Sequence, residues 1–221
     1  MAKPRSYKLL CPIARALDRI GDRWTLLILR DLHAGPARFT DIQRGLSGIS
    51  VNLLTERLAK LTEDELVEKV EGEHGVALYG LTNRGRKTRD ILFDLAQFGG
   101  LFPPPEVTVR PGNLRLIAVT LGTAVERSLG ADVSFNLSMI VDGEAFSLQA
   151  ADGSCEMLYR RADNPDMTLR TSYEALLAVS ENELSLTDFA QNHCQIEVST
   201  PGKDQFVFAA LSAALAGLQE K

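Results

Sequence analysis

The sequence predicts an α+β protein made of two parts, and three observations lead to this expectation. The first half reads as helices closed by a β-hairpin, whereas the second half reads as strands grouped ahead of helices. Between them, the run Pro103-Pro104-Pro105 cannot continue a helix and favours an extended spacer. Residues 1–104 contain 16 Lys and Arg against 13 Asp and Glu, whereas residues 105–221 contain 8 against 16. We therefore expect domains at residues 1–102 and 106–221.

The composition is that of an ordinary globular protein. Apolar residues make up 45% of the chain and charged residues 24%. No apolar run approaches the roughly 18 residues of a membrane span, and the N-terminus does not read as a secretory signal. The three cysteines, Cys11, Cys155 and Cys194, form no close pair. We expect reduced thiols in a cytoplasmic protein that has no membrane association.

The elements of the first half follow from helix and turn signals. Pro12 suits the first turn of a helix that ends near Gly21. Residues 24–32 are nearly all apolar, which predicts the buried helix of this domain. Ser50 suits the cap of the helix after the next turn. The expected elements are helices at 12–20, 24–32, 40–46, 51–61 and 82–101, with strands at 67–71 and 76–81 around a loop at 72–75. This is the order of a winged helix-turn-helix, whose second helix enters the DNA major groove.

The helix at 51–61 has a surface that suits DNA recognition. At about 100° per residue, Leu54, Leu58 and Leu61 form a stripe that faces the core. The opposite side is short and polar, and asparagine can contact adenine while threonine can touch a thymine methyl group. The alternative is a merely solvated helix face. The DNA-contact candidates are Arg38, Ser50, Asn52, Thr55, Glu56, Arg57, Lys60, Lys69, His74 and Arg84. Glu71 and Glu73 at the wing tip repel phosphate and argue against deep minor-groove insertion.

These motifs also form a string that resembles the HxlR-type regulators, a branch close to the MarR proteins. The string begins with Cys11-Pro12 and the run from Gly21 to Leu29. It continues through Arg38-Phe39, Gly48-Ile49-Ser50, Leu54-Thr55, Arg57-Leu58, Tyr79-Gly80-Leu81-Thr82 and Gly85. The resemblance implies a dimeric DNA-binding regulator, with the N-terminal helix and the helix at 82–101 forming the dimer interface. Glu65 departs from the family, which has glycine there, so the turn after the recognition helix is expected to be reshaped.

The second half alternates like half-buried strands and then turns helical. Residues 133–139 alternate strictly, and the pairs Asp142-Gly143 and Asp152-Gly153 are strong hairpin signals. Strands are expected at 133–139, 145–150, 155–160, 166–170 and 195–199, with helices at 113–129, 172–179, 186–192 and 204–218. This order favours helices packed on one face of a sheet.

In pattern and order, the second half resembles the sterol-carrier-protein fold. The resemblance rests on residues 133–138, the Asp142-Gly143 turn, residues 164–169, the helix from Ser172 and Leu184-Ser185-Leu186. That fold can leave an apolar tunnel, which implies a small apolar effector. The residues that could line it are Phe135, Leu137, Met139, Phe146, Leu148, Met157 and Tyr159. The alternative is a filled core, because a domain of this size needs most of those side chains to fold.

Residues for catalysis or metal binding do not come together in the sequence. His33, His74 and His193 lie far apart, and no phosphate loop, dinucleotide fingerprint or nucleophile elbow occurs. We therefore expect no enzyme, no metal and no cofactor. Cys11 precedes a helix N-terminus, which favours the thiolate form of a cysteine, so it is a candidate redox thiol. The alternative for Cys11 is a small side chain at the dimer interface.

Two functions follow as hypotheses. The first is a transcriptional regulator that binds double-stranded DNA as a homodimer on a pseudo-palindromic operator, modulated by an apolar ligand in the second half. The alternative is a soluble lipid-binding or carrier module, in which the first half serves as a dimerisation scaffold. The operator, the regulated genes and the sign of regulation leave no signal in the sequence.

Overall fold

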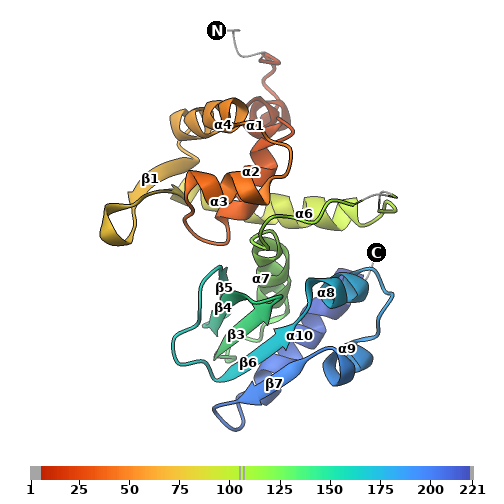
Figure 1. The fold of residues 1–221 in the computed structure, drawn as a ribbon. Helices are drawn as coiled ribbons and strands as arrows, with labels where there is room; N and C mark the ends of the chain where they lie inside the picture. The colour runs from red at the N-terminus through yellow and green to blue at the C-terminus, as the bar shows by residue number, and fades with distance from the viewer. Residues whose placement is uncertain (1–5, 105, 107, 220–221) are drawn as a thin grey trace.

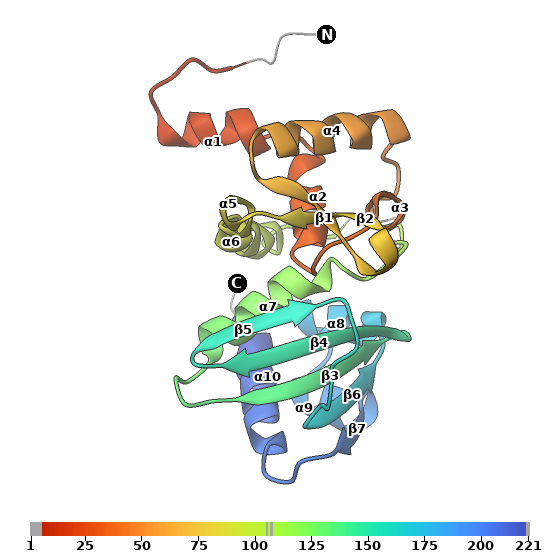
Figure 2. The same cartoon turned by 90° about the vertical axis from the view of Figure 1, so that its left-hand side faces the viewer.

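The computed structural model describes residues 6–104, 106 and 108–219, so Pro105 of the expected spacer lies outside the described residues. The first half is a group of helices with a two-stranded hairpin, and the second half lies against one side of it (Figures 1 and 2). The mixed helix-and-sheet class is confirmed. A search of the described residues finds no helix long and apolar enough to cross a membrane.

The elements of the first half follow the predicted order. Pro12 begins the first helix and Gly21 follows its last residue. Ile28 and Leu29 of the second helix are completely buried, which confirms that this helix is the centre of the core. The elements are α1 (Pro12–Ile20), α2 (Thr25–Leu32), α3 (Phe39–Gly45), α4 (Val51–Glu63), β1 (Val67–Glu71), the 3-10 turn Glu73–Gly75, β2 (Ala77–Leu81), α5 (Asn83–Arg86) and α6 (Arg89–Gly99).

The single helix expected at residues 82–101 was wrong, because the chain forms α5 and α6 with a break at residues 87–88. Thr82 caps α5 by accepting a hydrogen bond from the Gly85 amide at 3.1 Å. Thr88 is buried at the break, and its hydroxyl donates to the Gly85 carbonyl at 2.7 Å. Thr82 thus begins α5 and Thr88 begins α6, although neither residue type breaks a helix by itself.

The second half forms a five-stranded sheet with helices packed on it. Its strands lie in the order β5-β4-β3-β6-β7; β3 and β6 are parallel and the other neighbours antiparallel. The elements are α7 (Ile117–Ser128), β3 (Phe135–Val141), β4 (Glu144–Ala151), β5 (Ser154–Leu158), β6 (Met167–Thr171), α8 (Tyr173–Ser180), α9 (Leu186–Asn192), β7 (Gln195–Val198) and α10 (Asp204–Gln219). Helix α7 begins four residues later than expected and β3 two residues later.

Both predicted Asp-Gly turns are present. Asp142 and Gly143 have φ values of 49° and 84°, and Asp152 and Gly153 have φ values of 52° and 71°. Two consecutive positive φ values match the twist of a two-residue hairpin, and Asp-Gly pairs adopt them readily. These turns join β3 to β4 and β4 to β5.

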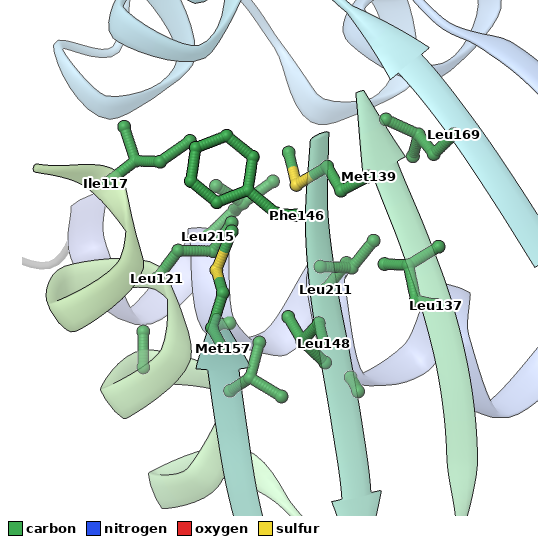
Figure 3. Close-up of a cluster of buried hydrophobic side chains, with 14 of the residues drawn as sticks. Ile117, Leu121, Leu137, Met139, Phe146, Leu148, Met157, Leu169, Leu211 and Leu215 are labelled. Atoms are coloured by element: carbon green, nitrogen blue, oxygen red, sulfur yellow. The ribbon is translucent and has the colours of Figure 1, made fainter. Parts of the chain in front are cut away.

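One hydrophobic core fills the space between the sheet and its helices. Figure 3 shows Ile117 and Leu121 of α7 and Leu211 and Leu215 of α10 facing the side chains of the sheet. Phe146 at the centre is completely buried. The residues considered for a tunnel all belong to this cluster: Phe135, Leu137, Met139, Phe146, Leu148 and Met157 are buried, and Tyr159 packs against it half-buried.

The two halves are joined by buried polar side chains, although the sequence suggested a spacer. Arg115 is 4% exposed; its Nε donates to the Asp31 carbonyl at 3.0 Å, and its Nη2 donates to the Gly35 carbonyl. Asn113 donates to the Asp41 carbonyl at 2.8 Å. The helical backbone of α7 starts after both residues, at Ile117.

A second polar connection joins α6 to α7 and β5. Arg89 donates to the Thr123 hydroxyl at 2.9 Å, to a Glu126 carboxylate oxygen at 2.8 Å and to the Cys155 carbonyl at 3.0 Å. Glu126 also accepts from the Cys155 amide at 2.7 Å. All three η and ε nitrogens of Arg89 are therefore used, and α6 is held at a fixed position on the second half.

His33 sits between α2 and the α5–α6 break. Its Nε2 lies 3.0 Å from the Thr88 hydroxyl, which already donates to Gly85, so Nε2 carries the proton and donates. Burial, and then the nearby Arg89 and Arg86, lowers the pKa of His33 to about 4. The folded state therefore requires a neutral imidazole.

This burial predicts a pH-dependent stability. Because the folded pKa lies below the unfolded value, the contribution of His33 is complete above about pH 6.5 and is lost as the pH falls toward about 4. The wild-type protein should lose roughly 2 kcal/mol more unfolding free energy between pH 7 and pH 5 than His33→Gln. Denaturant titration of both proteins at each pH measures this difference. Equal losses in the two proteins would contradict it.

Candidate nucleic-acid interface

Helix α4 follows a short turn after α3 and presents the predicted polar face. Ser50 caps it, as expected, by accepting a hydrogen bond from the Leu53 amide at 3.2 Å. Leu54, Leu58 and Leu61 are at most 1% exposed, which confirms the predicted helix phase. Leu53 is half-buried against the same core.

The outer side of α4 is exposed and lies away from the second half (Figure 2). Asn52, Thr55 and Glu56 are exposed there. The Thr55 hydroxyl donates to the Val51 carbonyl at 2.8 Å, so that donor is already used within the helix. Asn52 has no intramolecular hydrogen bond to a described residue, and its amide is available to a base edge.

Two of the predicted cations on α4 are already paired with carboxylates. Arg57 has Nε 2.9 Å from an Asp22 oxygen and Nη1 3.0 Å from Glu56. Lys60 Nζ lies 3.1 Å from Glu63 and 3.2 Å from Asp64. Neither pairing was visible in the helix pattern, and both reduce the positive charge available to phosphate.

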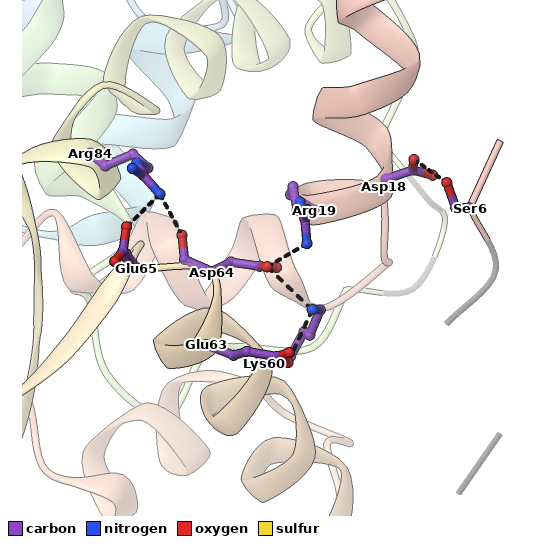
Figure 4. A network of polar contacts seen from close by, with 8 residues as sticks. All are labelled: Ser6, Asp18, Arg19, Lys60, Glu63, Asp64, Glu65 and Arg84. Atoms are coloured by element: carbon purple, nitrogen blue, oxygen red, sulfur yellow. Dashed lines mark hydrogen bonds and ion pairs between the residues drawn. The ribbon is translucent and has the colours of Figure 1, made fainter. Parts of the chain in front are cut away.

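The end of α4 is tied to its neighbours by the network in Figure 4. The Asp64 carboxylate accepts from Arg19 of α1 at 2.6 Å as well as from Lys60. Arg84 of α5 pairs with Glu65 at 2.8 Å and donates to the Asp64 carbonyl at 3.3 Å. Arg84 therefore fixes the turn after α4 in addition to being a DNA-contact candidate.

Glu65 keeps the turn in a left-handed backbone with φ of 56°. The side chain is exposed, and a residue with a Cβ is strained in this region. Replacing Glu65 by glycine should therefore raise the free energy of unfolding by about 0.5–1 kcal/mol. Glu65→Ala is the matched control, because it removes the pairing with Arg84 but keeps the Cβ. In thermal and denaturant melts, Glu65→Gly should be more stable than Glu65→Ala. Equal stabilities of the two variants would contradict backbone strain at residue 65.

The remaining candidates lie around α4. Arg38 is exposed at the N-cap of α3 and makes no ion pair within the described residues. Lys69 on β1 is exposed, with its Nζ 6.0 Å from the Tyr79 ring centroid. His74 is exposed at the wing tip with φ of 57°. Arg23 was not among the predicted contacts, and it is exposed over the Trp24 ring beside the Asp22–Arg57 pair. In the sequence, Arg23 stood out only as part of the family motif from Gly21 to Leu29.

The cysteines differ in accessibility. Cys11 is exposed immediately before α1, whereas Cys155 is buried. Burial raises the pKa of Cys155 to about 12 and also raises that of Cys194, so both stay protonated thiols near neutral pH. Among the described residues, no group of three or more His, Cys, Asp or Glu is placed to hold a metal ion.

Comparison with known proteins gives matches to regulators. A family model described as HxlR-like helix-turn-helix matches residues 19–106. The HTH-type transcriptional regulator YodB of Bacillus subtilis is 34% identical over 103 residues, which are 45% of this chain and 92% of YodB. The uncharacterized HTH-type transcriptional regulator Rv3095 of Mycobacterium tuberculosis is 38% identical over 97 residues, which are 42% of this chain and 61% of that protein. The crystal structure of quinone-bound YodB, 32% identical, covers 42% of this chain with a TM-score of 0.37.

Proposed function

The chain belongs to the HxlR-like helix-turn-helix family of transcriptional regulators, and from this we propose that it binds duplex DNA as a homodimer on a pseudo-palindromic operator. Its relatives are regulators and not enzymes. The observation that carries the proposal is the exposed polar face of α4, capped by Ser50 and clear of the second half (Figure 2). A helix of this kind, placed behind a turn and beside a hairpin, fits the major groove.

An apolar stripe supports the homodimer. Ile91, Leu95 and Phe98 of α6 are 46%, 47% and 58% exposed, and their spacing places them on one face of the helix. On α1, Ile13 and Leu17 are 72% and 46% exposed. Exposed apolar side chains gathered in this way mark an interaction surface. A second copy of the chain would cover both helices and set the spacing between two α4 helices.

We further propose that residues 106–221 form a sensor domain of the sterol-carrier type. The packed core in Figure 3 leaves its proposed tunnel residues in contact with α7 and α10, so an apolar ligand there would have to displace side chains. The polar connections through Arg115 and Arg89 supply a route to the first half. An effector acts through such a route only if it binds the DNA-competent and DNA-incompetent states with different affinities.

Competition binding tests the proposal directly. Fragments from around the gene of this protein compete with random duplex of equal length, at low and moderate salt. The proposal expects one fragment to bind more tightly than random duplex, with affinity that falls steeply as salt rises. Equal affinity for all fragments would contradict sequence-specific binding.

Two variants separate base recognition from phosphate contact. Arg38→Ala should weaken binding to all sequences alike and reduce the salt slope by about one unit per phosphate lost in each half-site. Asn52→Ala should relax the preference at one base position by about 1–3 kcal/mol. Binding assays on a panel of single-base operator variants measure both effects. An unchanged preference in Asn52→Ala would show that its amide does not reach a base.

A further inference from the structure

A groove of about 310 Å³ lies at the junction between the two halves. One side is formed by Trp24, Leu27 and Arg30 around α2, by Gly45 at the end of α3, and by Leu46 and Ser47 of the turn that leads to α4. The other side is formed by Val109, Pro111, Leu116 and Tyr173 of the second half. The groove therefore touches the turn that leads into the recognition helix, and it touches both halves.

Arg30 supplies the charged side chain in the lining of the groove. Its Nε and Nη2 both lie 2.8 Å from one Asp31 oxygen. Asp31 is 1% exposed, and its second oxygen has no hydrogen-bond partner within the described residues. The buried Arg115 guanidinium lies near the carboxylates of both Asp31 and Asp41. The side chain of Arg30 remains 24% exposed toward solvent.

The rest of the lining is mixed, with apolar side chains and two residues that carry hydroxyl groups. The Trp24 ring, Leu27 and Leu116 offer apolar surface, and Ser47 and Tyr173 offer hydroxyls. The nearby Arg110 is already paired with Asp142 at 2.6 Å. Small-ligand sites combine mostly apolar walls with a few placed polar groups, in volumes upward of about 300 Å³. The groove therefore fits a compact molecule with one negative end.

We propose that this groove binds a small carboxylate with an apolar body, with the carboxylate on Arg30 and the body between Trp24 and Leu116. The proposal moves the effector site from the core of the second half to the junction. A bound molecule contacts the α3–α4 turn and the second half together, and segment 111–113 is already fixed on α3 through the Asn113 contact with Asp41. Its effect on DNA rests on the proposed function, whereas its binding does not.

Trp24 provides a direct probe, because it is the only tryptophan of the chain. The full-length protein is titrated with octanoate and with cyclohexanecarboxylate, and with the corresponding uncharged amides. The expected result is a saturable change in tryptophan fluorescence, with the carboxylates at least about 10-fold tighter than their amides, as a charge-assisted contact implies. Absence of saturation, or equal affinity for acid and amide, would overturn the proposal.

Variants of Arg30 test where the carboxylate end of the ligand binds. Arg30→Met should remove the 10-fold preference for the carboxylate. The single variant leaves Asp31 without its Arg30 partner, so the double variant Arg30→Met with Asp31→Asn is measured as well. The double variant should also lose the preference for the carboxylate. Arg86→Met, which changes an exposed arginine outside the groove, should keep the preference. A preference that survives in both Arg30 variants would overturn the assignment.

The same samples separate this inference from the proposed function. DNA binding is measured with and without saturating octanoate. A protein that binds a specific fragment but gives no saturable carboxylate signal contradicts the groove and leaves DNA binding intact. A protein that binds carboxylate with the Arg30 dependence but no specific fragment supports the groove and contradicts the proposed function.

Discussion

Replacing Arg115 by methionine is expected to lower the free energy of unfolding by about 3–5 kcal/mol, because two carbonyls lose a charged donor and each such hydrogen bond contributes roughly 1.5–3 kcal/mol. Arg115 is 4% exposed and donates to the carbonyls of Asp31 and Gly35, and it lies over the Tyr159 ring. Without it, those carbonyls lose their donor, and the buried Asp31 carboxylate keeps Arg30 as its paired cation. Denaturant unfolding of the full-length protein measures the loss.

The matched control is Arg110→Met, which removes an arginine from the same segment. Arg110 is 70% exposed and pairs with Asp142 at the surface, so its loss should cost under about 1 kcal/mol. A loss in Arg115→Met as small as that of the control would contradict the role of Arg115 in joining the halves. Separate unfolding transitions for the two halves in Arg115→Met would support it further.

The double variant Leu95→Glu with Phe98→Glu is expected to convert a dimer to a monomer and to weaken operator binding by about 100-fold or more. Both side chains are about half exposed on α6, and carboxylates at their positions would have to be desolvated in a dimer interface. A monomer also loses the gain from binding two half-sites at once. Light scattering measures the mass against the 24.2 kDa of one chain, and anisotropy measures DNA affinity.

Leu177→Glu is the control for this variant, because Leu177 is a leucine of α8 that is 44% exposed but far from the α6 stripe in sequence. It should leave mass and DNA affinity unchanged. If Leu95→Glu with Phe98→Glu stays dimeric, the stripe is not the dimer interface, whatever happens to DNA binding.

Local signals in the sequence were sufficient for most elements. Ser50, Pro12 and the Asp-Gly turns act within a few residues, through a cap, a fixed φ or a positive φ, and each was found where expected. The core stripe of Leu54 and Leu58 follows from helix periodicity alone. In the turn after α4, Glu65 keeps a left-handed backbone in the place of the family's glycine.

Contacts between distant segments left no such signal. Arg115 and Asn113 read as ordinary polar residues at a helix start, yet they hold the two halves together. Likewise, the pairing of Arg57 with Asp22 depends on how α4 meets the chain ahead of α2. The break between α5 and α6 arises from the hydrogen bonds of Thr88, which depend on tertiary packing around His33. Residue type and periodicity do not encode these partners.

A footprint of the full-length protein on its tightest fragment tests the central claim most directly. Two α4 helices carried by a dimer should protect two major-groove patches about 34 Å apart, one turn of DNA, with pseudo-twofold symmetry between them. Protection should disappear from both patches together in Leu95→Glu with Phe98→Glu. A single protected patch, or protection no stronger than on random duplex, would contradict a dimeric regulator that reads DNA through α4.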